Sequence, residues 1–82
     1  VLPRLITLRP RLGHIGSVVT LTGRRFGSGG VVYFGSTPAT DYLRWGDFRI
    51  MVRVPEGTAP GGVEVTVRTI IGRSTAKTFV RL

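Results

Sequence analysis

The sequence predicts an all-β domain, a sandwich or barrel built from short strands. Turn residues punctuate the chain at roughly every eight to twelve positions. The runs between them are rich in β-branched residues and alternate between apolar and polar side chains, as half-buried strands do. A helical period does not persist anywhere over the length of a helix, and the 12 glycines would weaken any helix that formed. We therefore expect strands and no helix.

Each expected strand has one apolar face, because side chains two positions apart point to the same side. Threonine, arginine and glutamate fill most of the alternate positions, such as Arg49, Arg53 and Glu64. One-sided burial of this kind is typical of antiparallel sheets. The residues expected to face the core are Val19, Leu21, Val32, Phe34, Ile50, Val52, Val54, Val63, Val65 and Val67.

Three large aromatic side chains lie near strand ends, where simple alternation does not decide their burial. Phe79 is two positions from both Lys77 and Arg81, so in a regular strand all three side chains would point to the same face. They cannot all face one core without a bulge or an edge position. We expect Phe79 to be buried and the two basic residues to lie at the rim with their charged ends in water. Trp45 and Phe48 flank a Gly-Asp turn, which would bring both rings toward one end of the core.

Length and composition limit the classes of protein. The 82 residues allow one hydrophobic core, so we expect a single domain over residues 1–82 without a roomy cavity. With no cysteine, the chain has neither disulfides nor thiolate metal ligands. Apolar runs are too short to cross a bilayer, so we expect no membrane insertion.

The charge is strongly positive, at +8, with 12 basic and 4 acidic residues. Such a field favours polyanions or an acidic protein surface as partners. Eleven of the basic residues are arginines, which a GC-rich genome explains as readily as selection for forked hydrogen-bond donors. Both explanations stay open.

No catalytic or metal-binding pattern is present. His14 is the only histidine, and Ser17 close to it would still need an orienting carboxylate to act as a nucleophile. The acidic residues are dispersed over different loops and strands, which disfavours paired acid–base chemistry and metal binding. The glycine-rich stretch 27–30 has no following lysine–serine pair, so it predicts a hairpin and not a phosphate cradle. We expect no enzyme, no cofactor and no metal.

The order and spacing of the turns identify a resemblance. Its elements are Pro10, Gly13, Gly16, the strand VTLTG, Phe26-Gly27, Phe34-Gly35, Pro38-Ala39, Val54-Pro55, the turn GTAPGGV and Gly72. This pattern, which covers nearly the whole chain, resembles the IPT/TIG domain. The resemblance implies an immunoglobulin-like β-sandwich of the E-set type, with two antiparallel sheets and about seven strands. It also implies a role as a spacer, a dimerisation unit or a surface decoration.

The stretch GRRFG has two interpretations. Phe26 is expected to close one end of the sandwich, with the flanking glycines letting the chain turn back. Arg24 and Arg25 then project from the loop into solvent, and this structural interpretation is favoured. An arginine pair on a loop can also bind phosphate or carboxylate, so the two residues are the candidate polyanion site.

Other surface residues are candidates for protein binding. Ile70 and Ile71 occupy a hairpin tip, where exposed apolar residues are uncommon without a partner, although one of them could instead fold back over the core. Arg49, Met51 and Arg53 share an outer strand face. Tyr33 and Val31 would extend an adhesive patch if they lie beside Thr66 and Arg68, although ordinary cross-strand pairing explains them as well.

Three functions are compatible with these observations. The first is a non-catalytic interaction module on a larger protein assembly, with an acidic partner surface or a second copy as partner; a phage-like virion or an extracellular assembly is the favoured setting. The second is nucleic-acid binding, which the apparent scatter of the arginines over all strands disfavours. The third is an accessory domain of a carbohydrate-active protein, for which Tyr33, Tyr42 and Trp45 are the candidates for an aromatic platform.

Overall fold

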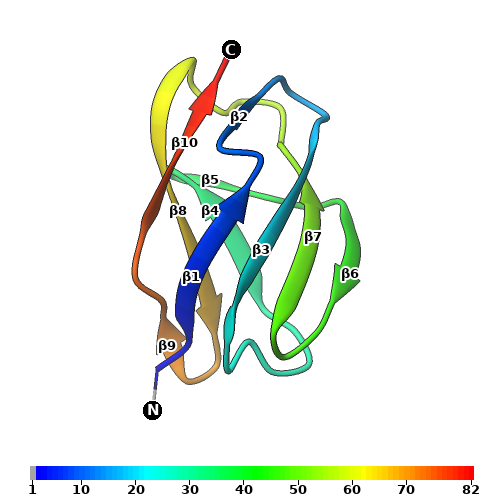
Figure 1. Ribbon diagram of the computed structural model, residues 1–82, viewed down its shortest axis with the longest axis vertical. Coiled ribbons are helices and arrows are strands. Elements are labelled where there is room, and N and C mark those ends of the chain that lie inside the picture. Colours follow the sequence, from blue (N-terminus) through cyan, green and yellow to red (C-terminus); the bar gives the residue numbers. More distant parts are fainter. Residues whose placement is uncertain (1) are drawn as a thin grey trace.

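The computed structural model describes residues 2–82, which form ten strands in two facing sheets (Figure 1). Val1, the first residue of the expected domain, lies outside the described residues. No helix occurs among residues 2–82, as predicted, and seven strands have at least four residues. The strands are β1 (Arg4–Arg9), β2 (Leu12–Gly13), β3 (Val18–Arg24), β4 (Val31–Phe34), β5 (Thr37–Pro38), β6 (Tyr42–Trp45), β7 (Arg49–Arg53), β8 (Gly61–Thr69), β9 (Gly72–Arg73) and β10 (Lys77–Arg81).

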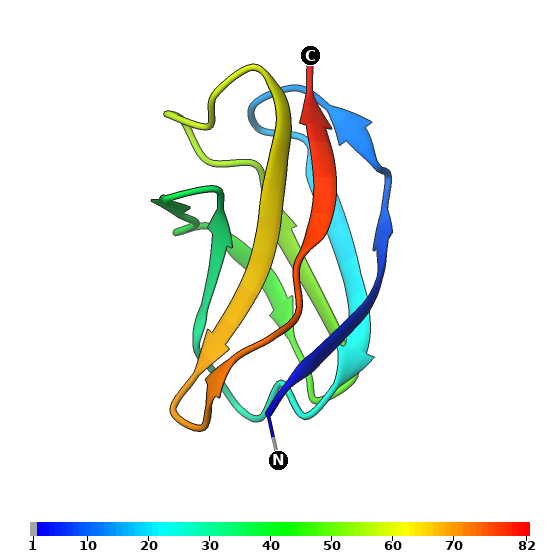
Figure 2. The same ribbon diagram turned by 90° about the vertical axis from the view of Figure 1, so that its left-hand side faces the viewer.

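The two sheets differ in composition. One has the order β1-β3-β7-β6, and these strands lie side by side across Figure 1. The other has the order β2-β10-β8-β4-β5, with β9 paired to β8; Figure 2 shows β10, β8 and β4 of this sheet. The pairs are antiparallel, except that β2 runs parallel to β10. This exception corrects the expectation of two purely antiparallel sheets, and it arises because the chain crosses from one sheet to the other between β1 and β2.

The core lies between the sheets, where 14 apolar side chains are buried. All of the predicted inward residues are among them except Val63, which is partly buried and packs against the core. Phe79 is fully buried and meets the Phe34 ring edge to face, with 5.6 Å between the ring centroids. Lys77 is exposed, as predicted. Arg81 is half-buried, with its Nε buried and not hydrogen-bonded to any of residues 2–82, so the expectation that its charged end lies in water is wrong for that atom.

Phe48 corrects the sequence-based prediction. Its side chain is 61% exposed, whereas Trp45 on the other side of the same turn is half-buried against the core. The Gly-Asp turn is expected to bring both rings toward the end of the core. That end is filled by Phe26, which has no exposed surface.

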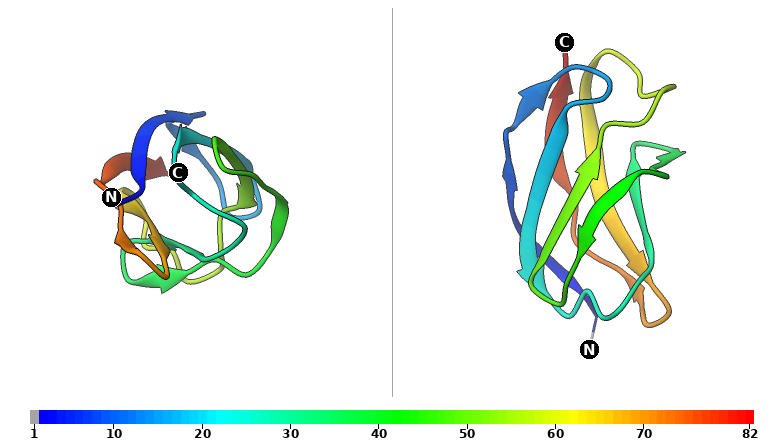
Figure 3. Two further views of the ribbon diagram at one scale, coloured as in Figure 1. Left: turned by 90° about the horizontal axis from the view of Figure 1, so that it is seen from below. Right: turned by 90° about the vertical axis from the view of Figure 1, so that its right-hand side faces the viewer.

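The molecule is elongated, with extents of 33 × 21 × 18 Å along its principal axes. The described chain starts at one end of the long axis and finishes at the other (Figure 1). The β8–β9 hairpin, the loop after β3 and the turn between β6 and β7 lie at the same end as Leu2 (Figures 1 and 3). None of residues 2–82 belongs to a helix that could span a membrane.

Candidate functional site

The loop between β3 and β4 closes one end of the core. Phe26 has no exposed surface, as predicted. Its N–H donates to the Asp47 carbonyl oxygen at 3.1 Å, and Trp45 Nε1 donates to the Phe26 carbonyl oxygen at 3.1 Å. The Gly27 N–H donates to Asp47 Oδ1 at 3.0 Å. These bonds hold Phe26 as a fixed plug and fasten the loop to the β6–β7 turn.

Arg24 and Arg25 are exposed beside this plug. They line a hollow of about 280 Å³ together with Asp47 and Phe48. Arg25 has a φ of 61°, in the left-handed region that residues other than glycine enter rarely, and it makes the turn that directs Phe26 into the core. Binding of a polyanion by this pair stays a prediction.

The tip of the β8–β9 hairpin is apolar and exposed. Ile70 is 98% exposed and Ile71 is 57% exposed, so neither folds back over the core. The Ile71 N–H donates to Thr69 Oγ1 at 3.2 Å, which shapes the turn and directs both side chains outward. The tip is therefore available for contact.

The outer face of the six-stranded sheet carries mixed side chains. Tyr33 lies opposite Thr66 and Val31 lies opposite Arg68, so β4 and β8 are neighbours as the predicted patch required. The Arg73 guanidinium stands over the Tyr33 ring at 5.9 Å from its centroid. We call this surface the mixed face; its outward residues are Val31, Tyr33, Glu64, Thr66, Arg68 and Arg73.

The outer face of the four-stranded sheet carries mostly arginine. Arg4 lies opposite Arg24, and Thr22 lies opposite Arg49. Arg9, Thr20, Met51 and Arg44 form one row across all four strands. The arginines do occur on most strands and in loops, as predicted, but strand pairing brings six of the 11 to this one outer face. We call the surface the arginine face; its arginines are Arg4, Arg9, Arg24, Arg44, Arg49 and Arg53.

The predicted protein-binding residues thus fall on different sheets. Arg49, Met51 and Arg53 lie on the arginine face, and the right-hand panel of Figure 3 shows their strand β7 between β3 and β6. Tyr33 and Arg68 lie on the mixed face, and the isoleucine tip extends from the same sheet. The structure therefore separates the predicted residues into two surfaces.

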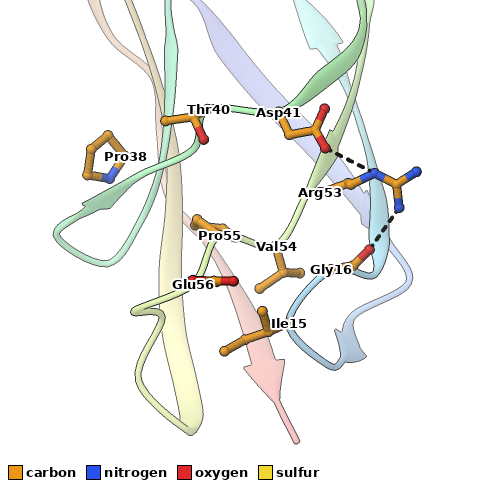
Figure 4. A pocket seen from close by; sticks show the side chains of 9 residues that line it. All are labelled: Ile15, Gly16, Pro38, Thr40, Asp41, Arg53, Val54, Pro55 and Glu56. Carbon is orange, nitrogen blue, oxygen red and sulfur yellow. Dashed lines mark hydrogen bonds and ion pairs between the residues drawn. The ribbon is translucent and has the colours of Figure 1, made fainter.

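A hollow of about 400 Å³ opens between the β2–β3 turn, the end of β7 and the segment after β5 (Figure 4). Arg53 Nε pairs with Asp41 Oδ2 at 3.1 Å, and Arg53 Nη1 donates to the Gly16 carbonyl oxygen at 3.1 Å. Figure 4 shows this bridge at one side of the hollow and Pro38 at the opposite side. Arg53, predicted to bind a partner, is therefore already engaged in fastening the β2–β3 turn.

The aromatic platform suggested for carbohydrate binding is not assembled. Tyr42 and Trp45 are half-buried, meet edge to face with 5.3 Å between their ring centroids, and pack against the core. The Tyr42 hydroxyl donates to the Ala39 carbonyl oxygen and accepts from the Val32 N–H, both at 2.9 Å. Burial raises the pKa of Tyr42 above its ordinary value of 10.0, while the Val32 hydrogen bond lowers it. Tyr33 lies on the other sheet.

The described residues offer no assembled reactive centre. Among residues 2–82, no three His, Cys, Asp or Glu side chains gather where they could hold a metal ion. His14 is exposed in its turn, and its backbone N–H donates to Ser17 Oγ at 3.0 Å. The Ser17 hydroxyl oxygen therefore serves the turn as a hydrogen-bond acceptor.

Comparison with known families assigns the chain. The IPT/TIG domain matches residues 3–80, nearly the whole of the two-sheet sandwich. The chain belongs to the IPT/TIG domain family. The resemblance inferred from its turns is therefore confirmed, and so is the expectation that it is not an enzyme, because the IPT/TIG domain is non-catalytic.

Related proteins are cyclomaltodextrin glucanotransferases, in which the IPT/TIG domain is a small part. One, from Bacillus sp. (strain 1011), is 41% identical over 64 residues, covering 74% of this chain and 9% of that protein. Another, from Paenibacillus macerans, is 37% identical over 82 residues, covering 94% of this chain and 11% of that protein. These relatives are carbohydrate-active enzymes and do not support the virion interpretation.

A solved structure agrees with this relationship. The crystal structure of a gamma-CGTase from alkalophilic Bacillus clarkii matches with a TM-score of 0.89 and 34% identity, over 98% of this chain and 12% of that one. The match confirms the immunoglobulin-like sandwich of the IPT/TIG domain. The relatives thus favour the third function considered from the sequence, an accessory domain of a carbohydrate-active protein, over the virion setting. The aromatic platform suggested for that function is not formed, because Tyr42 and Trp45 pack against the core.

Proposed function

We propose that this IPT/TIG domain is a non-catalytic accessory module of a carbohydrate-active enzyme related to the cyclomaltodextrin glucanotransferases. One observation carries the proposal. The relatives from Bacillus sp. (strain 1011) and Paenibacillus macerans align with 74% and 94% of this chain, while the chain spans about a tenth of each relative. Because most of the chain aligns with a small part of larger enzymes, we infer that it supports the neighbouring domains of such an enzyme.

The shape of the domain supports a spacing role within such an enzyme. The described ends lie at opposite ends of a body 33 Å long, so segments joined to them are held apart. The hydrogen bonds around Phe26 and the Arg53 bridge fasten turns at the two ends of the sandwich. A body with fixed ends transmits the orientation of one neighbour to the next.

The proposal is tested by exchanging this chain for the matching segment of a related enzyme. In the Paenibacillus macerans enzyme, the aligned segment is replaced by this chain, and cyclodextrin formation from starch is measured beside a variant lacking the segment. We expect the chimera to keep activity within about threefold of the parent, and the deletion to lose most of its activity or heat resistance. A matched chimera carrying Gly23→Ala, which disrupts the sandwich, should resemble the deletion.

The isolated 82-residue chain provides the second measurement. It should fold and show no turnover of starch. A chimera that is folded but no more active than the deletion would contradict the accessory role.

A further inference from the structure

The exposed ring of Phe48 lies between two pairs of arginines. On one side it lines a hollow of about 320 Å³ with Thr22, Arg44 and Arg49, at the lower end of the arginine face. On the other side it lines the hollow of about 280 Å³ that Arg24 and Arg25 share. A phenylalanine that is 61% exposed is thus surrounded by cationic side chains from three different segments.

The fold holds this ring in place. The Phe48 carbonyl oxygen accepts from the Gly23 N–H at 2.9 Å, which fastens its backbone to β3. The turn that contains it is closed by a bond of 2.7 Å from the Gly46 N–H to the Arg49 carbonyl oxygen. Asp47, the acidic group in both hollows, accepts from the Gly27 N–H. An exposed apolar ring with a fixed backbone is preorganised for contact, which lowers the entropic penalty of binding.

The four arginines around the ring form no direct ion pair in the described part of the chain, although the Asp47 carboxylate lines both hollows. Among residues 2–82, the one ion pair joins Arg53 to Asp41, away from these hollows. Arg24 also lies directly opposite Arg4, an arrangement of like charges that destabilises a sheet. The four arginines and one aspartate around Phe48 therefore keep an excess of positive charge at a small cost to folding, and an anionic partner would remove that cost.

We propose that Phe48 and its surrounding arginines Arg24, Arg25, Arg44 and Arg49 form a docking site for an acidic protein surface that offers an apolar pocket to the ring. Aromatic residues and arginine are enriched where protein interfaces concentrate their binding energy. Arginine forks pair with carboxylates in two hydrogen bonds at once. A second copy of the chain is a poor occupant, since it also carries a charge of +8.

Single-stranded nucleic acid is the less favoured occupant. Proteins that bind it stack successive bases on several aromatic side chains. Here one exposed ring stands in the cluster, because Phe26 is fully buried and Trp45 is half-buried with its Nε1 bonded to the Phe26 carbonyl oxygen. The proposal rests on the proposed function in one respect, that a non-catalytic module acts through contacts with other protein surfaces.

The test uses the 82-residue chain labelled with ¹⁵N and two synthetic peptides of equal length and charge, one of glutamate and serine, the other of glutamate and leucine. Amide shifts are followed by nuclear magnetic resonance at about 50 mM NaCl. We expect both peptides to shift Thr22, Arg44 and Phe48 while Tyr33 and Thr66 on the mixed face stay unchanged. The leucine-containing peptide should bind more tightly.

Variants distinguish the contribution of the Phe48 ring to binding from the contribution of the arginine charges. Phe48→Ala should remove the advantage of the leucine-containing peptide, whereas Arg44→Ser with Arg49→Ser should weaken both peptides by about tenfold. The matched control, Arg11→Ser with Arg68→Ser, makes the same change in net charge away from the site and should weaken both by less than about twofold. Thermal unfolding verifies that every variant is folded.

Three outcomes would overturn the proposal. One is equal loss of affinity in the control and in the site variant, which would mean that net charge alone drives binding. Another is the absence of shifts at the cluster with either peptide. The third is binding of an oligothymidylate of 12 nucleotides at least about tenfold tighter than the leucine-containing peptide with dependence on Phe48, which would make nucleic acid the occupant. Because no enzyme chimera is involved, failure here leaves the accessory role standing.

Discussion

The two outer faces of the sandwich differ although both inner faces are apolar. Inside, the four-stranded sheet contributes leucine, isoleucine and valine to the core, and the six-stranded sheet contributes valine and phenylalanine. Outside, one sheet gathers six arginines, and the other combines tyrosine, threonine and valine with two arginines and Glu64. Burial determines what faces inward, but it places no demand on the sign of the charge outside. The difference between the faces is therefore where contacts beyond the fold can be sought.

The arginine face depends on the pairing of β1 with β3. We expect the largest loss of stability from a substitution that pushes these two strands apart. A Cβ at Gly23 would overlap the Arg4 carbonyl oxygen and approach the Phe26 ring at 2.6 Å. We expect Gly23→Ala to lower the free energy of unfolding by about 3 kcal/mol or more, measured by urea denaturation followed by circular dichroism. Gly29→Ala, where a Cβ meets no atom within 4 Å, is the control and should be nearly neutral. Equal stability of both variants would mean that β1 is not held as described.

A second prediction concerns the link between the two sheets. Tyr42 on β6 joins the four-stranded sheet to Val32 on β4 through its hydroxyl. Tyr42→Phe leaves the Val32 N–H without this acceptor and should cost about 2 kcal/mol at pH 7 in thermal or urea unfolding. A loss below about 0.5 kcal/mol would show that the hydroxyl does not connect the sheets.

The same residue predicts a dependence on pH. Because burial raises the pKa of Tyr42, the folded chain keeps the proton at pH values where the unfolded chain releases it. Stability from this group is complete below pH 10 and is lost as the pH rises through the higher folded pKa. The difference in stability between the wild type and Tyr42→Phe should therefore be constant below pH 10.0, the ordinary pKa of tyrosine, and should narrow as the pH rises above it. A difference that stays constant above that pH as well would contradict the assignment.

Salt should change the stability effect of removing an arginine from the arginine face more than that of removing one elsewhere. Arg24 faces Arg4 across β3 and β1, so Arg24→Thr should raise stability by about 0.5 kcal/mol in 20 mM NaCl, roughly the size of other exposed charge effects. The gain should disappear at about 1 M NaCl, where screening is strong. Arg11→Thr, outside the arginine face, is the control for the loss of one charge. Equal gains in both variants would indicate repulsion over the whole molecule.

The isoleucine tip should contribute least to stability. Ile70 is almost fully exposed, so Ile70→Ser should change the free energy of unfolding by less than about 0.5 kcal/mol. A loss above about 1 kcal/mol in thermal unfolding would mean that the side chain packs against the sandwich in solution.

The sequence predicted what depends on local alternation and missed what depends on pairing between distant strands. The inward valines and Phe26 were predictable because period-two burial and turn spacing are written in adjacent residues. Arg9 and Arg44 share a row only because β1, β3, β7 and β6 pair in that order, which alternation cannot reveal. The parallel pairing of β2 with β10 has the same non-local origin.

Part of the candidate site escaped prediction for a related reason. The sequence suggests Arg24, Arg25 and Arg49 as binding residues. It also suggests that the Gly-Asp turn brings Phe48 toward the end of the core. That space is occupied by Phe26, which is 22 positions earlier in the sequence. Which of two phenylalanines fills one end of a core is decided by packing in three dimensions. An exposed aromatic residue beside arginines could have been suspected only if the strand order had been known.

The placement of the two ends has a mechanical consequence. If the chain were pulled at both ends of its long axis, β1 would be drawn lengthwise along β3, and β10 along β8. The hydrogen bonds of each ladder would then share the load together and would not open one after another as in a zipper. The domain should yield little under tension until a whole ladder fails at once.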